Sequence, residues 1–159
     1  MQYVILEDIR SAHNVGAIFR TADGAGVAKI CLVGYTPLPT DRFGRVQSDI
    51  HKTSLGAADT VPWEWYIDSV SCIASLKKEG VAVVAVEQAS EAIPYYTYKP
   101  SEHTAYVFGN EVTGVAKETL RVTDAIIDIP MYGAKESLNV ATATGIVLFN
   151  AKAQTLPRS

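Results

Sequence analysis

The stretch IPMYGAKESLNVATATG, residues 129–145, joins a polar loop that contains a glycine to a helix made almost wholly of small and apolar residues. Apolar positions occur on two sides of this helix, so neither side is suited to water. We therefore expect the helix, predicted over about residues 138–153, to be covered on both sides. One stripe contains Leu138, Ala141, Gly145 and Leu148, and the other contains Val140, Ala143 and Val147.

The rest of the chain alternates between strand patterns and helix patterns. Short apolar runs rich in β-branched residues predict strands, and apolar residues at helical spacing predict the helices between them. Continuous apolar strands flanked by helices are typical of a mostly parallel sheet covered on both faces, so the predicted fold class is α/β. The predicted strands are 2–9, 29–34, 62–66, 81–88, 104–110 and 125–130, and the predicted helices are 14–26, a short one within 52–61, 67–79, 116–121 and 138–153.

The first predicted helix has a start signal and a stop signal. Asn14 is a good N-cap residue, and Gly24 or Gly26 is a good stop. Arg20 lies about 140° around the helix from Val15, off the apolar stripe, where it is free to face a substrate. The stripe itself is formed by Val15, Ile18, Phe19 and Ala22.

The chain has 159 residues, of which 48% are hydrophobic and 19% are charged. This length suits a single domain over residues 1–159, with no separate RNA-binding domain. The mean hydropathy of +0.10 is slightly more apolar than a soluble monomer needs, which hints at an interface. No apolar run of about 18 residues or more is present, and the start MQYVILEDIRS lacks a basic segment, so we expect a cytoplasmic protein with no membrane span.

The net charge of −3 argues against non-specific coating of nucleic acid, because that affinity depends on the number of phosphates neutralised. Any RNA contact is therefore expected to be local. The candidate RNA-binding residues are Arg42, Arg45 and Lys52, in the region after the second strand, together with Arg20. On charge alone, an ordinary solvated loop explains this cluster equally well.

Cysteine and histidine show no pattern of a metal site or a disulfide. Cys31 lies within a predicted strand and Cys72 within a predicted helix, where each is expected to be a small buried hydrophobic residue. The three histidines lack the spacing of metal ligands. We therefore predict that the protein uses no metal.

Three stretches follow predicted strands at the edge where a parallel sheet binds its ligands. They are HNVGAIFRTA at 13–22, FGNEVTG at 108–114 and IPMYGAKESLNVA at 129–141. In the first stretch, Arg20 is suited to phosphate, because arginine binds phosphate through two parallel hydrogen bonds. In the second, Gly109 follows a strand and lets the backbone approach a ligand. In the third, Ser137 can cap a helix whose first N–H groups are free. Each feature also has a plain alternative: a solvated arginine, a turn or an ordinary helix cap.

Taken together, three segments resemble the three motifs of the SpoU, or TrmH-like, group of SPOUT RNA methyltransferases. They are NVGAIFRTADGAGV at 14–27, YVFGNEVTGV at 106–115 and IPMYGAKESLNVATATGIVLF at 129–149, and the resemblance extends over residues 3–150. It implies transfer of a methyl group from S-adenosylmethionine (AdoMet), without metal, to a ribose 2′-hydroxyl of tRNA or rRNA. It also implies a C-terminal trefoil knot, a rare exception to unknotted topology, and an obligate homodimer in which the first and last helices pack against a twofold mate.

The resemblance also assigns the site residues, position by position. The residues expected to contact or lie near AdoMet are Gly109, Ile129 and Leu138, through backbone groups, with Asn110, Met131 and Val86. The residues that match the polar active-site positions are Asn14, Arg20, Glu111, Ser137 and Asn139.

The role of Arg20 is open to two interpretations. The family proposal makes this arginine the group that activates the ribose hydroxyl, but a guanidinium has a pKa above about 12 and stays protonated in proteins. We therefore assign Arg20 the clamping of a phosphate beside the target ribose, so that catalysis depends mainly on positioning. Glu111 and Asn14 would hold the arginine and the ribose, while Ser137 and Asn139 would shape the pocket wall.

Two other functions compete with this interpretation. One is a knotted protein that binds RNA or AdoMet without turnover, which the complete set of polar positions disfavours. The other is an unrelated nucleotide-binding α/β enzyme, which the absence of G-x-G-x-x-G after the first strand disfavours. Among RNAs we favour tRNA slightly over rRNA, because many rRNA-modifying relatives carry an additional N-terminal domain.

Overall fold

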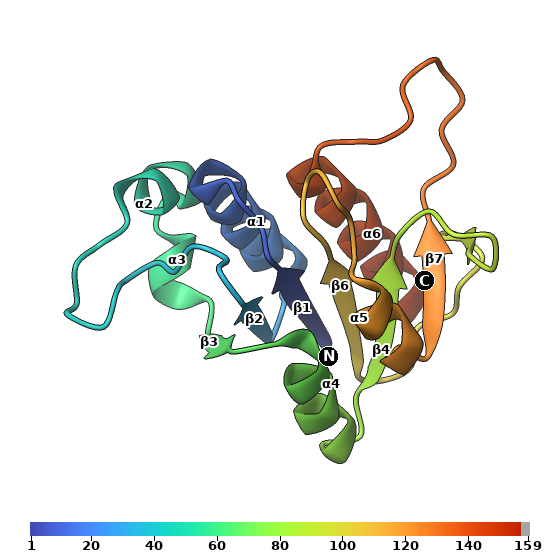
Figure 1. The fold of residues 1–159 in the computed structure, drawn as a ribbon, viewed down its shortest axis with the longest axis horizontal. Helices are drawn as coiled ribbons and strands as arrows, with labels where there is room; N and C mark the ends of the chain where they lie inside the picture. The colour runs from blue at the N-terminus through green and yellow to red at the C-terminus, as the bar shows by residue number, and fades with distance from the viewer. Residues whose placement is uncertain (157–159) are drawn as a thin grey trace.

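A computed structural model describes residues 1–156, in which one sheet contains seven strands. The strands are β1 Gln2–Glu7, β2 Lys29–Val33, β3 Trp63–Tyr66, β4 Ala82–Val86, β5 Ile93–Pro94, β6 Thr104–Phe108 and β7 Ala125–Asp128. Their order across the sheet is β3-β2-β1-β6-β4-β7-β5, and every neighbouring pair is parallel (Figure 1). The predicted parallel sheet is confirmed, and β5 is a short edge strand that the sequence pattern did not predict.

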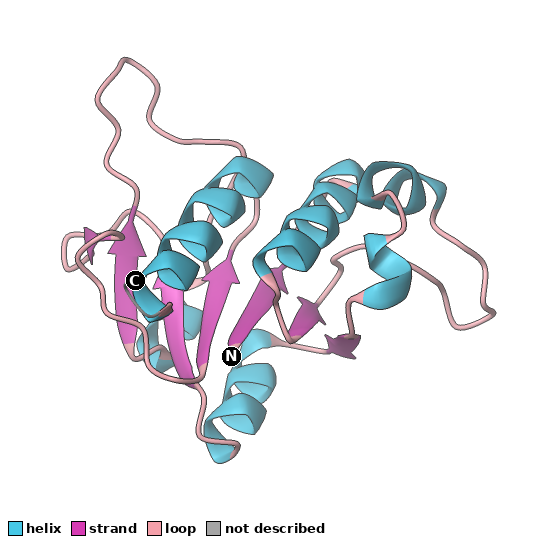
Figure 2. Cartoon of the chain, turned by 180° about the vertical axis from the view of Figure 1, so that it is seen from behind, coloured by secondary structure: helices cyan, strands magenta, loops and turns pink. Residues whose placement is uncertain are grey.

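Helices cover both faces of this sheet, as predicted. The helices are α1 Ala12–Ala25, α2 Ser48–Ser54, α3 Ala57–Thr60, α4 Ser69–Lys78, α5 Lys117–Val122 and α6 Val140–Thr155. Residues of α1, α2, α3 and α6 share one buried cluster with the sheet, whereas α4 and α5 pack against the opposite face. Figure 2, seen from behind, shows α1 and α6 lying over the strands. The α/β fold class is therefore confirmed, and the trefoil knot stays a prediction.

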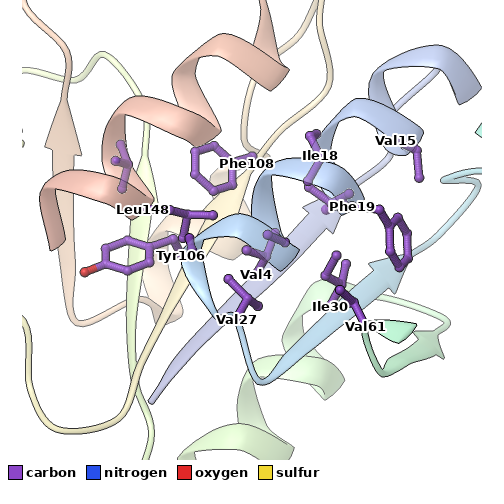
Figure 3. Close-up of a cluster of buried hydrophobic side chains, with 14 of the residues drawn as sticks. Val4, Val15, Ile18, Phe19, Val27, Ile30, Val61, Tyr106, Phe108 and Leu148 are labelled. Atoms are coloured by element: carbon purple, nitrogen blue, oxygen red, sulfur yellow. The ribbon is translucent and has the colours of Figure 1, made fainter. Parts of the chain in front are cut away.

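Successive residues of β1 point to opposite faces of the sheet, and both faces are buried. Val4 and Leu6 belong to the cluster beneath α1 and α6, whereas Ile5 belongs to the cluster beneath α4. Figure 3 shows the first cluster, in which Ile18 and Phe19 of α1 lie over the strands. Burial on both faces is the reason why the strands read as continuous apolar runs.

The starts of two helices differ from the prediction because different residues cap them. Ser11, not Asn14, is the N-cap of α1, and its Oγ accepts a hydrogen bond from the backbone N–H of Asn14 at 3.1 Å. Asp68 caps α4 by accepting from the N–H of Ser71 at 2.7 Å, so that helix begins two residues later than expected. The predicted stop at Gly26 is correct, since this residue adopts the left-handed backbone with φ of 69°.

The last helix, α6, starts at Val140 because Asn139 caps it, and the predicted cap Ser137 lies outside the helix. The Oδ1 atom of Asn139 accepts from two backbone N–H groups of the first turn. Leu148 of one apolar stripe and Val147 of the other are buried within the chain, whereas Phe149 is 51% exposed. Cover of the exposed part of this helix by a twofold mate stays a prediction.

The carboxyl ends of the parallel strands meet at one edge of the sheet, which brings distant segments together. The strand order reverses at β1, whose neighbours are β2 on one side and β6 on the other. Such a switch point is where parallel sheets place their ligand site. The arrowheads of β1, β6, β4 and β7 point toward the same edge in Figure 1, and the loop between β7 and α6 rises beyond it.

Cys31 and Cys72 are both buried, as predicted, and neither is in a disulfide. No helix within residues 1–156 has the length and apolar character that a membrane crossing requires.

Candidate active site

A cavity of about 990 Å³ lies beyond the carboxyl ends of β1, β4, β6 and β7. Its walls come from the loops after these strands and from the first turn of α6. All six predicted cofactor-binding residues line it, and so do three of the five predicted catalytic residues. These residues are Val86, Gly109, Asn110, Ile129, Met131 and Leu138 for the cofactor, and Glu111, Ser137 and Asn139 for catalysis.

A chain of hydrogen bonds joins Asn14, Glu111 and Asn139, one from each of the three stretches that the sequence singled out. The Nδ2 of Asn14 donates to Oε1 of Glu111 at 3.2 Å. The Nδ2 of Asn139 donates to Oδ1 of Asn14 at 3.1 Å. Asn14 itself does not line the cavity, but it orients two side chains that do. The three polar groups therefore act as one unit at the rim of the cavity.

Glu111 is held as a carboxylate by the backbone at the start of α1. The N–H of Arg10 donates to Oε2 at 2.9 Å, and the N–H of Ser11 donates to Oε1 at 3.2 Å. Partial desolvation, the largest single influence, raises the pKa of Glu111, but these hydrogen bonds and the one from Asn14 together outweigh it and lower the pKa below 4.5. The side chain is therefore ionised at neutral pH.

The backbone at Gly109 allows the loop after β6 to fold back tightly on itself. A Cβ atom at this position would lie 2.3 Å from the carbonyl carbon of Gly114 and from the nitrogen of Val115. The N–H of Gly114 donates to the carbonyl of Asn110 at 2.9 Å, which closes the turn. Only glycine fits this close approach, so the backbone of Gly109 is presented directly to the cavity.

Asn110 stabilises the same loop, and its side chain is fully used in doing so. Its Nδ2 donates to the carbonyl of Asp8 at 2.8 Å and to the hydroxyl of Tyr35 at 3.0 Å. Its Oδ1 accepts from the N–H groups of Val112 and Thr113 at 2.8 and 2.9 Å. Because both donors and both acceptor positions are engaged, the side chain of Asn110 positions the loop and has no hydrogen-bonding capacity left for a ligand.

Two acidic residues that sequence reasoning missed also organise the cavity. Glu7, only 5% exposed, accepts hydrogen bonds from the hydroxyls of Ser69 and Thr119 and from the N–H of Ala116. Glu87 accepts from the N–H of Val115 at 2.8 Å. Each follows an apolar run at the end of a strand, and this position was the signal that could have revealed them. Through these hydrogen bonds, the two side chains hold the loop after β6 and the start of α5 against the ends of β1 and β4.

Arg20 lies elsewhere, on the outer side of α1. It lines a second hollow of about 590 Å³ between α1, α2 and α6, together with Lys52 and Phe149. Within one chain, the structure therefore does not bring Arg20 to the cavity that holds Glu111 and Asn139. Arg42 and Arg45 lie on an exposed loop before α2 and share neither hollow.

No group of three or more histidine, cysteine, aspartate or glutamate side chains that could hold a metal ion was found within residues 1–156.

An all-parallel α/β sheet with a cavity at its switch point, and with hydrogen-bonded polar groups from three separate segments at the rim, defines the class of protein. The chain belongs to the SpoU rRNA Methylase family, whose model matches residues 1–149. This match confirms the resemblance found in the three motifs and excludes an unrelated nucleotide-binding enzyme.

Known relatives cover almost the whole of this chain. The 23S rRNA (guanosine-2′-O-)-methyltransferase RlmB of Xanthomonas axonopodis pv. citri is 35% identical over 153 residues, which are 96% of this chain and 59% of that protein. The chain thus spans about three fifths of the length of the curated relatives it matches.

Two solved structures show the same fold. The AdoMet-bound rRNA methyltransferase from Sinorhizobium meliloti has a TM-score of 0.87 and 33% identity, and the match covers 98% of this chain and 57% of that one. A structure described as giving insights into the 2-OH methylation of C/U34 on tRNA has a TM-score of 0.82 and 25% identity, and the match covers 97% of this chain and 95% of that one.

Proposed function

We propose that this protein is an AdoMet-dependent RNA methyltransferase that transfers a methyl group to a ribose 2′-hydroxyl. The observation that carries the proposal is the hydrogen-bonded unit of Asn14, Glu111 and Asn139 at the rim of the cavity. These residues come from all three motifs of the family to which the chain belongs. A binding protein without turnover would have no need to hold an ionised carboxylate and two oriented amides beside the ligand site.

The cavity fits AdoMet in size and in lining. Its volume lies within the range of small-molecule sites, roughly 300–1,000 Å³. The half-buried backbone at Gly109 lines the cavity and offers peptide groups to a polar ligand, while Val86, Ile129 and Leu138 provide apolar contacts. A bound AdoMet would supply a methyl group on a sulfonium sulfur, and the sulfur would leave as a neutral thioether while the proton of the acceptor hydroxyl passes to water. The residues of the chain then have only to place and polarise the acceptor hydroxyl.

The polar unit would orient the target ribose. Each amide of Asn14 and Asn139 has a second N–H beyond the bond that it makes within the unit. These groups and the carboxylate of Glu111 can hold the sugar hydroxyls in a fixed direction. Positioning of this kind lowers the barrier by converting a bimolecular step into one between oriented groups.

We also propose that the protein acts as a homodimer, because Arg20 needs a second chain to approach the cavity. The hollow that Arg20 lines also contains Ala17, Gly24 and the half-exposed ring of Phe149. A twofold mate packed on this surface of α1 and α6 would cover the second side of α6 and carry its own Arg20 toward the reaction site. Protonated Arg20 would clamp a phosphate beside the ribose and stabilise the developing alkoxide.

The comparisons support two RNA substrates. The RlmB relatives act on guanosine in 23S rRNA and are the more similar in sequence. The structure concerned with C/U34 of tRNA matches this chain over nearly the full length of both molecules. Both substrates present a ribose 2′-hydroxyl, so the reaction class is the same for either.

Mass spectrometry of nuclease-digested tRNA and rRNA, after reaction with the protein and labelled AdoMet, tests the function. A 2′-O-methylated nucleoside is the expected product, and its source identifies the RNA. The variant Arg20→Ala should lose most of this product while binding AdoMet normally in calorimetry. Methylation on a base would contradict the reaction class, and full activity of Arg20→Ala would remove the phosphate clamp.

A further inference from the structure

The loop before α2 ends in a small turn, residues 40–46, that the proposed mechanism does not use. We call this segment the aromatic tip. Thr40 and Val46 pair as an antiparallel bridge at its base, and the N–H of Asp41 donates to the carbonyl of Arg45 at 3.0 Å. Gly44 adopts the left-handed backbone with φ of 77° and donates to the carbonyl of Asp41 at 2.9 Å. The tip is therefore an ordered turn.

The side chain of Asp41 fixes this turn further. Its Oδ1 accepts from the N–H groups of Phe43 and Arg45 at 2.8 and 3.0 Å, and its Oδ2 accepts from Nε of Arg45 at 2.6 Å. These hydrogen bonds, chiefly the one from the Arg45 backbone, lower the pKa of Asp41. One carboxylate thus sets both the backbone of the tip and the direction of the Arg45 guanidinium.

Phe43 stands at the end of this ordered turn and is 68% exposed. The guanidinium carbons of Arg42 and Arg45 lie 4.8 and 5.2 Å from the centre of its ring. A single exposed apolar residue is ordinary on a protein surface. An exposed ring with two arginines close to it, on a turn that is already ordered, has the composition of a platform on which an unpaired base stacks while cations hold the neighbouring phosphates.

The charge of this region favours stacking over simple phosphate attraction. Residues 41–52 contain three basic side chains and two acidic ones, and one of the acidic groups is paired with Arg45. Counterion release by so small an excess of charge would give weak binding. Base stacking needs no net charge, and a preformed turn reduces the entropy lost on binding. The ring, rather than the arginines alone, must then supply much of the affinity.

We propose that the aromatic tip binds a single-stranded segment of the RNA substrate, with Phe43 stacked on an unpaired base and with Arg42 and Arg45 on the adjoining phosphates. The proposal rests on the RNA substrate of the proposed function and adds that the bound segment is unpaired. In Figure 1 the tip projects beyond α2, on the far side of α1 from the loop that follows β7. The tip is therefore a positioning element that affects RNA affinity and KM, not the chemical step.

The test compares variants of Phe43 in the full-length protein. Fluorescence anisotropy measures binding to an unstructured ten-nucleotide RNA and to a fully paired RNA hairpin. Phe43→Leu, which keeps an apolar side chain but removes the ring, should weaken binding of the unstructured RNA by roughly 5- to 150-fold, the range for loss of one stacked base. Phe43→Tyr keeps the ring and should retain the affinity.

Salt dependence separates the ring from the arginines. Phe43→Leu should leave the slope of log affinity against log salt unchanged, whereas Arg42→Gln and Arg45→Gln should each reduce it by about 0.7, the value for one phosphate contact on a single strand. Ile67→Ala is the matched control, because Ile67 is 71% exposed and belongs to the connection between β3 and α4, outside the tip. This control should bind RNA as the wild type does.

Several outcomes would overturn the proposal. They are wild-type affinity in Phe43→Leu, an equal loss of affinity for paired and unpaired RNA, and failure of the wild type to bind either RNA. The last result would indicate a protein partner for the tip instead. Calorimetry with AdoMet and nucleoside analysis report on the proposed function separately. If the wild type methylates nothing but Phe43→Leu still loses unpaired RNA, the proposed function fails and the role of the tip stands.

Discussion

The Nδ2 of Asn139 donates a hydrogen bond to Oδ1 of Asn14 at 3.1 Å, although 125 positions separate the two residues. The same side chain of Asn139 caps α6 through its oxygen. One amide therefore starts the last helix and fixes the orientation of a residue in the first. Glu111 continues the link through its bond with Asn14, so the start of α1, the loop after β6 and the start of α6 are held together beside the cavity.

The two functions of the Asn139 amide can be separated by substitution. Asn139→Asp keeps an oxygen for the N–H groups of α6 but loses the donor to Asn14, whereas Asn139→Ala loses both. We expect Asn139→Ala to lower the free energy of unfolding by about 1 kcal/mol and Asn139→Asp to change it little. Both should slow methyl transfer by about tenfold, the loss of one hydrogen bond. Urea unfolding and single-turnover methylation measure the two effects, and equal stability of the two variants would contradict the capping role.

Gly109 can be tested by adding a single methyl group. In Gly109→Ala the new Cβ would lie 2.3 Å from backbone atoms of Gly114 and Val115, which cannot move without reshaping the loop. We expect a loss of about 1–3 kcal/mol in stability and a clear loss of AdoMet affinity, measured by urea unfolding and calorimetry. Gly133→Ala is the control, because no atom lies within 4 Å of its Cβ position. Unchanged AdoMet binding in Gly109→Ala would show that the loop does not shape the ligand site.

The pKa of Glu111 predicts a dependence of stability on pH. Because its pKa in the folded chain lies below 4.5, its ionised form stabilises the fold above that pH, and this contribution disappears as the pH falls through the lower folded value. When the pH is lowered from about 6 to about 3, the free energy of unfolding of Glu111→Gln should therefore fall less than that of the wild type. The difference should be modest because the side chain is exposed. Urea unfolding across this range measures the difference. Glu91→Gln, at an exposed loop position, controls for the loss of one carboxylate; the same pH profile in both variants would count against the hydrogen-bonded role.

The proposed dimer predicts a specific effect of charge on α6. Phe149→Glu places a carboxylate on the half-exposed side of this helix, beside the hollow that contains Arg20. We expect the wild type to sediment as a dimer and Phe149→Glu as a monomer, with methylation reduced at least tenfold and AdoMet binding retained. Analytical ultracentrifugation and calorimetry check these expectations. Ile67→Glu adds the same charge at another exposed apolar site and should remain dimeric, and a monomeric wild type would rule out the shared site.

Patterns within short windows were sufficient to predict the class of fold. The apolar runs around β1, β4 and β6 were recognised as strands, and the spacing of Val15, Ile18 and Phe19 identified the core side of α1. These signals are local, because side-chain direction repeats every two residues in a strand and every 3.6 in a helix. The lengths and boundaries of the helices do not follow from these signals. The capping residue depends on which side chain is free to accept a hydrogen bond from the N–H groups of the first turn.

The sequence on its own also determined which residues could form the site. The glycine after β6, the acidic residue two positions later and the polar residues before α6 all stand where parallel strands leave the sheet, and they do line the cavity. Arg20 lies off the apolar stripe of α1, as its spacing from Val15 predicts. The separation of these residues in the sequence does not predict the distances between them in the folded chain.

Only the tertiary structure decided the partners. The insertion of β6 between β1 and β4 brings Glu111 to the start of α1 and places Glu87 under Val115. The tertiary structure also makes Asn139, rather than Ser137, the cap of α6. It places Arg20 at a separate hollow. These contacts join residues far apart in the chain, so they follow from the order of strands in the sheet, which local propensity does not encode.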